Sequence, residues 1–169
     1  MTTKKTLYVI RHAKSSWKDL TLADWERPLN KRGKRDLPIM GNYLRSKGIS
    51  IDHFISSHAV RARLTAECMA SYLSFPLEKI VINQQYYHAS PDELVQELKT
   101  IPSKFNSTAI FGHNPGLTAL INQITDAGLA NLPTCGVAAI ALSIAQWDEI
   151  PMVQGTLSFL IAPKTLPYQ

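Results

Sequence analysis

The stretch Thr6-Leu7-Tyr8-Val9-Ile10-Arg11-His12 decides how this chain is interpreted. Its first part, Thr6–Ile10, is apolar and rich in β-branched and aromatic side chains, which is typical of a buried strand. An arginine and a histidine follow directly. In open α/β sheets, ligands bind beyond the carboxyl ends of the strands. The segment therefore predicts a strand that ends at a functional site.

Five further segments have the same strand character and are bounded by polar or breaker residues: His53–Ser56, Lys79–Asn83, Thr108–Phe111, Val137–Ser143 and Thr156–Ala162. Apolar residues at helical spacing lie between them, in Lys34–Ser46, Arg61–Leu73, Ser90–Ile101 and Leu117–Ile124. This alternation predicts an α/β fold, a three-layer αβα sandwich with a mostly parallel sheet. The last two strands have no clear helix between them, so we expect them to pair antiparallel at or near an edge.

Composition limits the protein class. The 169 residues fit one domain spanning residues 1–169, and 45% hydrophobic with 18% charged residues is an ordinary globular composition. No apolar run approaches the roughly 20 residues that span a bilayer, and no signal-peptide pattern occurs, so we expect a cytoplasmic protein with no membrane contact. Cys68 and Cys135 are too few for a disulfide framework and are expected to be buried free thiols.

Polar residues follow three of the predicted strands. Arg11 and His12 come after the first, Arg61 lies shortly after the second, and His113 and Asn114 come after the fourth. Two arginines and two histidines at one sheet edge make a pocket for a dianion, and phosphate is the commonest one. The net charge of +5 fits an anionic partner.

A histidine in such a pocket has two uses. It can donate a hydrogen bond to phosphate, or it can attack phosphorus as a neutral imidazole, because nearby arginines disfavour the imidazolium form. The sequence has no carboxylate cluster for Mg²⁺, no G-x-x-x-x-G-K-[ST] loop and no metal-ligand spacing. We therefore expect phosphoryl chemistry that uses histidine and arginine, without metal or organic cofactor.

Three motifs in this chain resemble the signatures of the histidine phosphatase superfamily, whose fold is phosphoglycerate mutase-like. They are Arg11-His12 followed by a small residue, the Ser57–Ala66 segment with Arg61 and Ala62, and Gly112-His113-Asn114-Pro115. The segment Arg11–Trp17, followed by Arg27-Pro28-Leu29 and Arg32-Gly33, is similar to the corresponding segments of the small SixA-type phosphohistidine phosphatases. The motifs occur in the order and spacing of that family.

The resemblance implies roles for individual residues. His12 matches the nucleophile that becomes phosphorylated, and His113 matches the histidine that stabilises the transferring phosphoryl group. Arg11 and Arg61 match the two phosphate-binding arginines. We also expect substrate contacts from three further residues: Ser15, Lys18 and Asn114. The implied substrate is a phosphohistidine-bearing protein; no nucleic-acid partner is expected, and the oligomeric state is not predicted.

The carboxylate that acts as general acid in many members of the family has no clear match. His88, Asp92 and Glu93 are the nearest candidates, although Glu93 also completes a capping box with Ser90. An alkoxide leaving group needs a proton, whereas imidazole is protonated more easily, so this gap favours phosphohistidine. Two alternatives stay open: a small-molecule phosphomonoesterase, and a non-catalytic module that binds phosphate or a phosphoprotein.

Several other features have simpler interpretations. We favour structural or surface roles for His53, His58 and His88, and a surface role for Arg63. The basic run Lys31–Arg35 is interpreted as the solvated start of a helix rather than a nucleic-acid patch.

The connection Ala13–Leu29, about 17 residues long, exceeds the usual length of roughly 2–6 and is predicted to be functional. Its Trp17 and Trp25 either gate the pocket or pin the loop.

Overall fold

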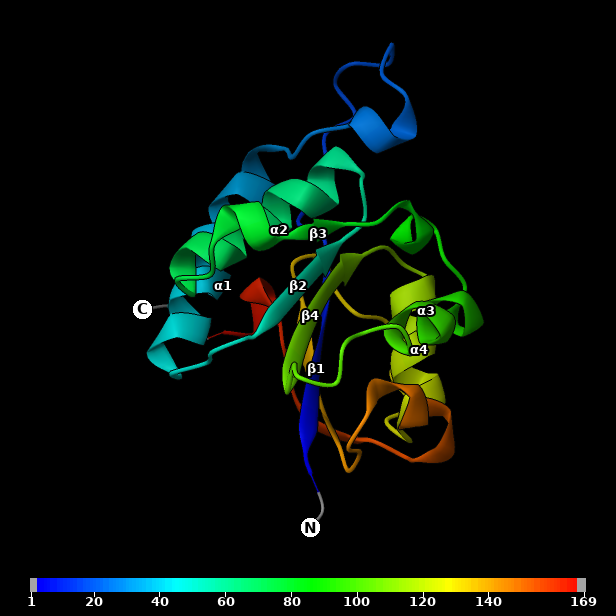
Figure 1. Cartoon of the computed structure of the whole chain (residues 1–169). Helices are drawn as coiled ribbons and strands as arrows, with labels where there is room; N and C mark the ends of the chain where they lie inside the picture. Colours follow the sequence, from blue (N-terminus) through cyan, green and yellow to red (C-terminus); the bar gives the residue numbers. More distant parts are fainter. Residues whose placement is uncertain (1–2, 167–169) are drawn as a thin grey trace.

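The sheet has six strands, in a computed structural model that describes residues 3–166. The strand order is β3-β2-β4-β1-β5-β6 (Figure 1). The bounds are β1 Lys5–Arg11, β2 His53–Ser56, β3 Val81–Ile82, β4 Ser107–Gly112, β5 Val137–Leu142 and β6 Thr156–Ile161. The first four strands of this order are parallel neighbours, whereas β5 pairs antiparallel with both β1 and β6. The predicted mostly parallel sheet and its antiparallel final pair are confirmed.

Helices cover both faces of the sheet, as Figure 1 shows. Their bounds are α1 Lys31–Ser46, α2 Val60–Tyr72, α3 Pro91–Leu98 and α4 Gly116–Ile124. Alternate residues of β1 face opposite layers: Tyr8 and Ile10 pack with α1 and α2, whereas Leu7 and Val9 pack with α3 and α4. The two apolar cores that result confirm the three-layer sandwich.

Some predicted boundaries are wrong for local reasons. The first helix begins at Lys31 rather than Lys34, because the Asn30 side chain accepts a hydrogen bond from the Gly33 N–H at 2.9 Å and caps the helix there. The third strand is shorter than Lys79–Asn83, since Leu77–Lys79 forms a 3₁₀ turn. The four basic side chains of Lys31–Arg35 are exposed in the first turns of α1, as expected for a solvated face.

Both cysteines are free, but only one is fully buried. Cys135 has no exposed surface, whereas Cys68 on α2 is half-buried, so the prediction of two buried thiols is wrong for Cys68. None of the helices within residues 3–166 is long and apolar enough to cross a membrane.

The long connection over residues 13–29 forms an arm with a closed base. The base is held by the Ser16 N–H, which donates to the Pro28 carbonyl at 2.8 Å, and by the Asn30 N–H, which donates to the Lys14 carbonyl at 3.0 Å. Gly33 lets α1 approach this base, because a Cβ at that position would lie 2.3 Å from the Lys14 oxygen. The tip carries a 3₁₀ turn, Asp24–Glu26, and projects past the strands at the top of Figure 1.

Candidate active site

The ends of β1, β4 and β2 meet because these strands are neighbours in the sheet. The His12 N–H donates to the Gly112 carbonyl at 3.2 Å, and the Ser57 N–H donates to the Phe111 carbonyl at 3.0 Å. These cross-strand bonds align the residues that follow each strand. As a result, the imidazole rings of His12 and His113 lie with their centroids 5.2 Å apart.

A pocket of about 230 Å³ opens at this edge of the sheet. It is lined by Arg11, His12, Lys14, Ser15, Trp17, Asp24, Arg27, Arg61, His88, His113, Asn114 and Thr134. The sequence-predicted residues Arg11, His12, Arg61 and His113 are thus brought together, with Ser15 and Asn114 beside them.

Lys18 is not among the lining residues and is exposed. The chain turns back after Ser16, whose hydroxyl accepts a hydrogen bond from the Lys18 N–H at 3.2 Å, and this turn carries Lys18 away from the pocket. Lys14 and Arg27 supply positive charge there instead.

His12 is held in one tautomer. Its Nδ1 lies 2.7 Å from the Ala13 carbonyl oxygen, which can only accept, so the ring proton is on Nδ1 and the lone pair is on Nε2. Burial is the largest of the causes that lower the pKa of His12, and the positive charges of Arg61, Arg11 and Arg27 act in the same direction; against an opposing contribution from the Ala13 hydrogen bond, together they lower the pKa to about 4. At neutral pH the ring is therefore uncharged.

The three arginines of the pocket share one pattern: each donates hydrogen bonds from some of its nitrogens and has another nitrogen without a partner among residues 3–166. Arg61 donates from Nη1 to the Asp24 carbonyl at 2.7 Å and from Nη2 to Asp24 Oδ2 at 2.9 Å. Arg27 Nε donates to Asp24 Oδ1 at 3.2 Å, and Arg11 Nη1 donates to the Leu132 carbonyl at 3.0 Å.

The buried atoms Arg11 Nε, Arg27 Nη1 and Arg61 Nε have no hydrogen-bond partner in the described part of the chain. Buried donors without partners are costly, so their gathering in one pocket indicates a site for an oxyanion.

His113 is a second neutral imidazole in the pocket. Its Nε2 lies 2.8 Å from Ser57 Oγ, and its buried Nδ1 has no partner among residues 3–166. Burial lowers its pKa well below the ordinary value, with further lowering by the charges of His12 and Arg61. The Ser57 hydroxyl can donate to Nε2, which places the ring proton on Nδ1. His113 then has an N–H for a bound oxyanion.

Asp24, at the tip of the arm, is a site residue that sequence reasoning missed. Its carboxylate accepts hydrogen bonds from Arg27 and Arg61, from the Tyr87 hydroxyl, and from His88 Nε2 at 3.2 Å. Burial raises the pKa of this carboxyl, but the hydrogen bonds from Tyr87 and Arg61 and the charge of Arg61 outweigh that effect and hold the pKa below its usual range. Asp24 is therefore an ionised anchor for the two arginines.

The three candidates for a proton donor have different surroundings. Asp92 accepts a hydrogen bond from Gln123 Nε2 at 2.9 Å, and Glu93 accepts one from the Ser90 N–H at 2.8 Å in the predicted capping box. Neither lines the phosphate pocket, whereas His88 does. The structural or surface role favoured for His88 is therefore incomplete, although the side chain is 52% exposed.

The remaining residues singled out in the sequence lie in structural contacts. His53 stacks on Phe105 with centroids 4.3 Å apart, and the His58 ring lies 5.5 Å from that of Trp25. Arg63 is at the surface, 3.7 Å from Glu67.

Trp17 lies in the wall of the pocket, with its ring 3.4 Å from the Arg27 guanidinium carbon. Across residues 3–166, no group of three or more His, Cys, Asp or Glu side chains is arranged to hold a metal ion.

Comparisons with known proteins agree with this geometry. The family model of the histidine phosphatase superfamily (branch 1) matches residues 7–81. An uncharacterised chloroplastic protein of Arabidopsis thaliana is 32% identical over 171 residues, which cover 94% of this chain and 78% of that protein. The chain belongs to the histidine phosphatase superfamily. An uncharacterised protein of Mycobacterium leprae is 28% identical over 92% of this chain and its own full length.

Solved structures of the superfamily share the fold. The protein histidine phosphatase SixA, in complex with tungstate, matches with a TM-score of 0.81 at 18% identity over 96% of this chain and 99% of its own. Phosphoglycerate mutase from Bacillus anthracis matches with a TM-score of 0.68 at 15% identity over 88% of this chain and 96% of its own. The phosphoglycerate mutase-like fold expected from the sequence is thereby confirmed.

Proposed function

We propose that this member of the superfamily is a phosphohydrolase that works through a phosphohistidine on His12, and that its substrate is phosphohistidine carried by a protein. Neutral His12 Nε2 attacks phosphorus in line as the bond to the leaving group breaks. Water then attacks the phosphorus of phospho-His12 and releases inorganic phosphate. Arg11, Arg27, Arg61 and His113 hold the phosphoryl oxygens in both steps.

The observation that carries this proposal is the state of His12: an uncharged ring with its lone pair on Nε2, in the lining of a pocket that also holds arginines with N–H groups that have no partner among residues 3–166. A nucleophile and fixed positive charge are the two parts that phosphoryl transfer needs, since its catalysis consists mostly of positioning and electrostatic stabilisation. The arginines supply the charge, so we propose a reaction without a metal ion.

Two observations support phosphohistidine as the substrate. Asp92 and Glu93 lie outside the phosphate pocket, the Glu93 carboxylate accepts a hydrogen bond from the Ser90 N–H, and Asp24 is ionised, so among residues 3–166 no protonated carboxylic acid lines the phosphate pocket. An imidazole leaving group has a smaller need of such an acid. The SixA with a matching fold is named a protein histidine phosphatase and holds tungstate, an oxyanion.

The test combines a turnover panel with trapping of the intermediate. We expect a phosphohistidine-bearing protein to be hydrolysed with a higher kcat/KM than p-nitrophenyl phosphate or sugar phosphates, with EDTA making no difference. Acid-labile, base-stable phosphate should map to His12 by mass spectrometry. His12→Ala should lose turnover and label together.

Wild-type turnover by His12→Ala would overturn the mechanism. A preference for sugar phosphates would identify a small-molecule phosphomonoesterase. Binding of phosphoprotein with neither turnover nor label would identify a binding module.

A further inference from the structure

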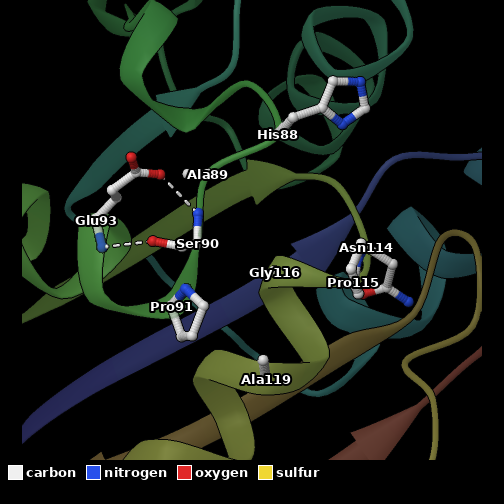
Figure 2. A pocket seen from close by; sticks show the side chains of 9 residues that line it. All are labelled: His88, Ala89, Ser90, Pro91, Glu93, Asn114, Pro115, Gly116 and Ala119. Atoms are coloured by element: carbon white, nitrogen blue, oxygen red, sulfur yellow. Dashed lines mark hydrogen bonds between the residues drawn. The ribbon is translucent and has the colours of Figure 1, made fainter.

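A second pocket of about 330 Å³ lies beside the phosphate pocket, between the start of α3 and the start of α4 (Figure 2). Its walls are mostly small and apolar and include Ala89, Pro91, Pro115 and Ala119. The two pockets share two lining residues, His88 and Asn114. When the phosphoryl group of a substrate lies among the arginines, the second pocket therefore offers space for the rest of the substrate, the part to which the phosphoryl group is bonded.

Of the two shared residues, Asn114 is committed to the fold. Its amide nitrogen donates to Asn131 Oδ1 at 3.0 Å and to the Leu132 carbonyl at 2.9 Å. Its oxygen accepts from the Thr118 N–H at 3.2 Å and from the Thr118 hydroxyl at 2.9 Å. His88 is thus the one shared residue whose side chain is available for chemistry.

His88 is held at this boundary at a conformational cost. Its φ is 50°, in the left-handed region that residues other than glycine rarely adopt. Its ring lies 4.2 Å from that of Tyr87 and 5.2 Å from that of His113, measured between centroids, and its Nε2 is 3.2 Å from Asp24 Oδ2. In Figure 2 the imidazole projects away from the start of α3 and lies above Asn114 and Pro115 in the view, apart from both.

We propose that the apolar pocket is the leaving-group subsite and that His88 is the proton donor to the leaving group. The proposal rests on the function proposed above and deepens it. Asp24 accepts the Nε2–H bond and fixes the ring, so Nδ1 is the nitrogen that meets the leaving group. Imidazole suits this task because its ordinary titration range lies nearest to neutral pH among the side chains.

His88 loses one proton in the first step and regains one in the second. In the first step, cationic His88 gives its Nδ1 proton to the leaving group, either to the ring nitrogen of phosphohistidine that is not bonded to phosphorus or to the bridging oxygen of an ester. The bond between the leaving group and phosphorus breaks as His12 Nε2 bonds to phosphorus. The leaving group departs neutral, and His88 is left neutral. In the second step, His88 takes a proton from the attacking water, the bond between His12 and phosphorus breaks, and phosphate leaves. His88 is cationic again at the end.

The walls of the subsite also define the class of leaving group. Ala89, Pro91, Pro115 and Ala119 offer hydrocarbon surface, which suits a flat group without charge, such as imidazole or a phenol. The one carboxylate in the lining, Glu93, accepts a hydrogen bond from the Ser90 N–H within the capping box.

A series of phosphoryl donors tests the proton donor. His88→Asn is the suitable variant, because asparagine tolerates the left-handed conformation better than most residues. We expect kcat/KM for phenyl phosphate to fall at least tenfold further than kcat/KM for p-nitrophenyl phosphate, whose weakly basic leaving group needs less protonation. The matched control is His53→Asn, which removes a histidine at the opposite end of β2 and should leave both substrates at wild-type rates.

The outcomes separate this inference from the function on which it rests. An equal fall for both substrates, or no fall, with phospho-His12 still trapped in the wild type, overturns the role of His88 alone. Absence of phospho-His12 from the wild type overturns the proposed function, and the inference with it.

A second variant, Ala119→Phe, tests whether the apolar pocket holds the leaving group, because it places an aromatic ring in that pocket. We expect it to lower kcat/KM for 2-naphthyl phosphate at least tenfold more than for acetyl phosphate, whose leaving group is small. Equal losses for the two substrates would show that the leaving group lies elsewhere.

Discussion

The two sides of the phosphate pocket are built in different ways. On the sheet side, His12 and His113 directly follow β1 and β4, are buried, and are aligned by hydrogen bonds between parallel strands. On the other side, Asp24 and Arg27 belong to an arm whose base is closed but whose tip reaches into solvent, where Leu20 is 85% exposed. The nucleophile lies on the rigid side, whereas the arm contributes Arg27 and the Asp24 carboxylate that orients Arg27 and Arg61.

This difference suggests a division of labour. Chemistry needs positions fixed to a fraction of an ångström, and strand ends in a packed sheet supply them. The arm reaches the reacting region through Asp24, which bonds to Arg27 and Arg61. Substitutions on the sheet side should therefore cost more activity than substitutions on the arm.

Arg61→Ala should have the largest effect in this comparison. Arg61 is buried at the start of α2, lines the pocket and donates to Asp24, and its Nε has no partner among residues 3–166, so its loss affects both sides at once. We expect kcat/KM for p-nitrophenyl phosphate to fall about 10³-fold, at the upper end of the effect of removing one oxyanion donor. Steady-state kinetics would measure this.

The matched control is Arg63→Ala, two residues further along the same helix, where the side chain is at the surface and pairs with Glu67. That variant should stay within about twofold of wild type, since surface ion pairs contribute little. Similar losses for the two variants would mean that the fall reports damage to α2 rather than lost phosphate binding.

Asp24→Asn tests how much the orienting carboxylate of the arm contributes to turnover. The amide keeps the shape of the side chain but removes the charge that holds Arg27 and Arg61. We expect kcat/KM to fall about 10- to 100-fold, which corresponds to the free energy of one hydrogen bond between charged groups.

Asp19→Asn is the control on the same arm, because Asp19 bonds only to Thr21 among the described contacts and should stay near wild type. A loss for Asp24→Asn as large as that for Arg61→Ala would break the proposed division between the sides.

The sheet side is predictable from the sequence, whereas most of the arm is not. Thr6–Ile10 and Thr108–Phe111 have unambiguous strand character, and the side chains that follow parallel neighbours must meet at one edge. That rule alone is enough to bring His12 and His113 together. The four α-helices and six strands of residues 3–166 follow from the same periodicities, although the predicted bounds of α1 and β3 are wrong.

The contacts of the arm join residues that are far apart in the sequence, and local sequence patterns do not predict such contacts. Asp24 bonds to Arg61, which is 37 residues away, and to Tyr87 and His88, which are further still. The prediction for Lys18 is wrong because a short turn at Ser16 reverses the chain. The spacing of three residues between Asp24 and Arg27 is a local indication that the two side chains pair. The surrounding segment, however, has no helical or strand periodicity that would show which way either side chain points.

Acid should destabilise the folded protein through the buried histidines of the sheet side. The folded-state pKa of His12, about 4, lies below the unfolded value near 6.5, so the unfolded chain binds this proton first as the pH falls. The contribution of neutral His12 to stability is therefore complete above pH 6.5 and is lost progressively down to pH 4. Between pH 7 and pH 5 the unfolding free energy should fall by about 2 kcal/mol because of His12. The lowered pKa of His113 acts in the same direction.

Urea unfolding at the two pH values would measure this effect. His12→Gln should reduce the difference in unfolding free energy between pH 7 and pH 5 by about 2 kcal/mol, because glutamine does not titrate. If the difference in unfolding free energy between pH 7 and pH 5 is unchanged in the variant, His12 titrates normally in the folded protein. The pocket would then not be what keeps the nucleophile neutral.

Trp17→Ala should have the smallest effect, although its ring lies in the pocket wall. The ring stacks 3.4 Å from the Arg27 guanidinium carbon, but Trp17 is 65% exposed, and exposed cation–π contacts contribute only about 0.5–1 kcal/mol. Arg27 also keeps its bond to Asp24 in the variant, so we expect a two- to fivefold fall in kcat/KM. Trp25→Ala, which removes an arm tryptophan that packs near His58 instead, should change kcat/KM less. A tenfold or larger loss confined to Trp17→Ala would show that the tryptophan closes over bound substrate, and the arm would then be a gate as well as an anchor.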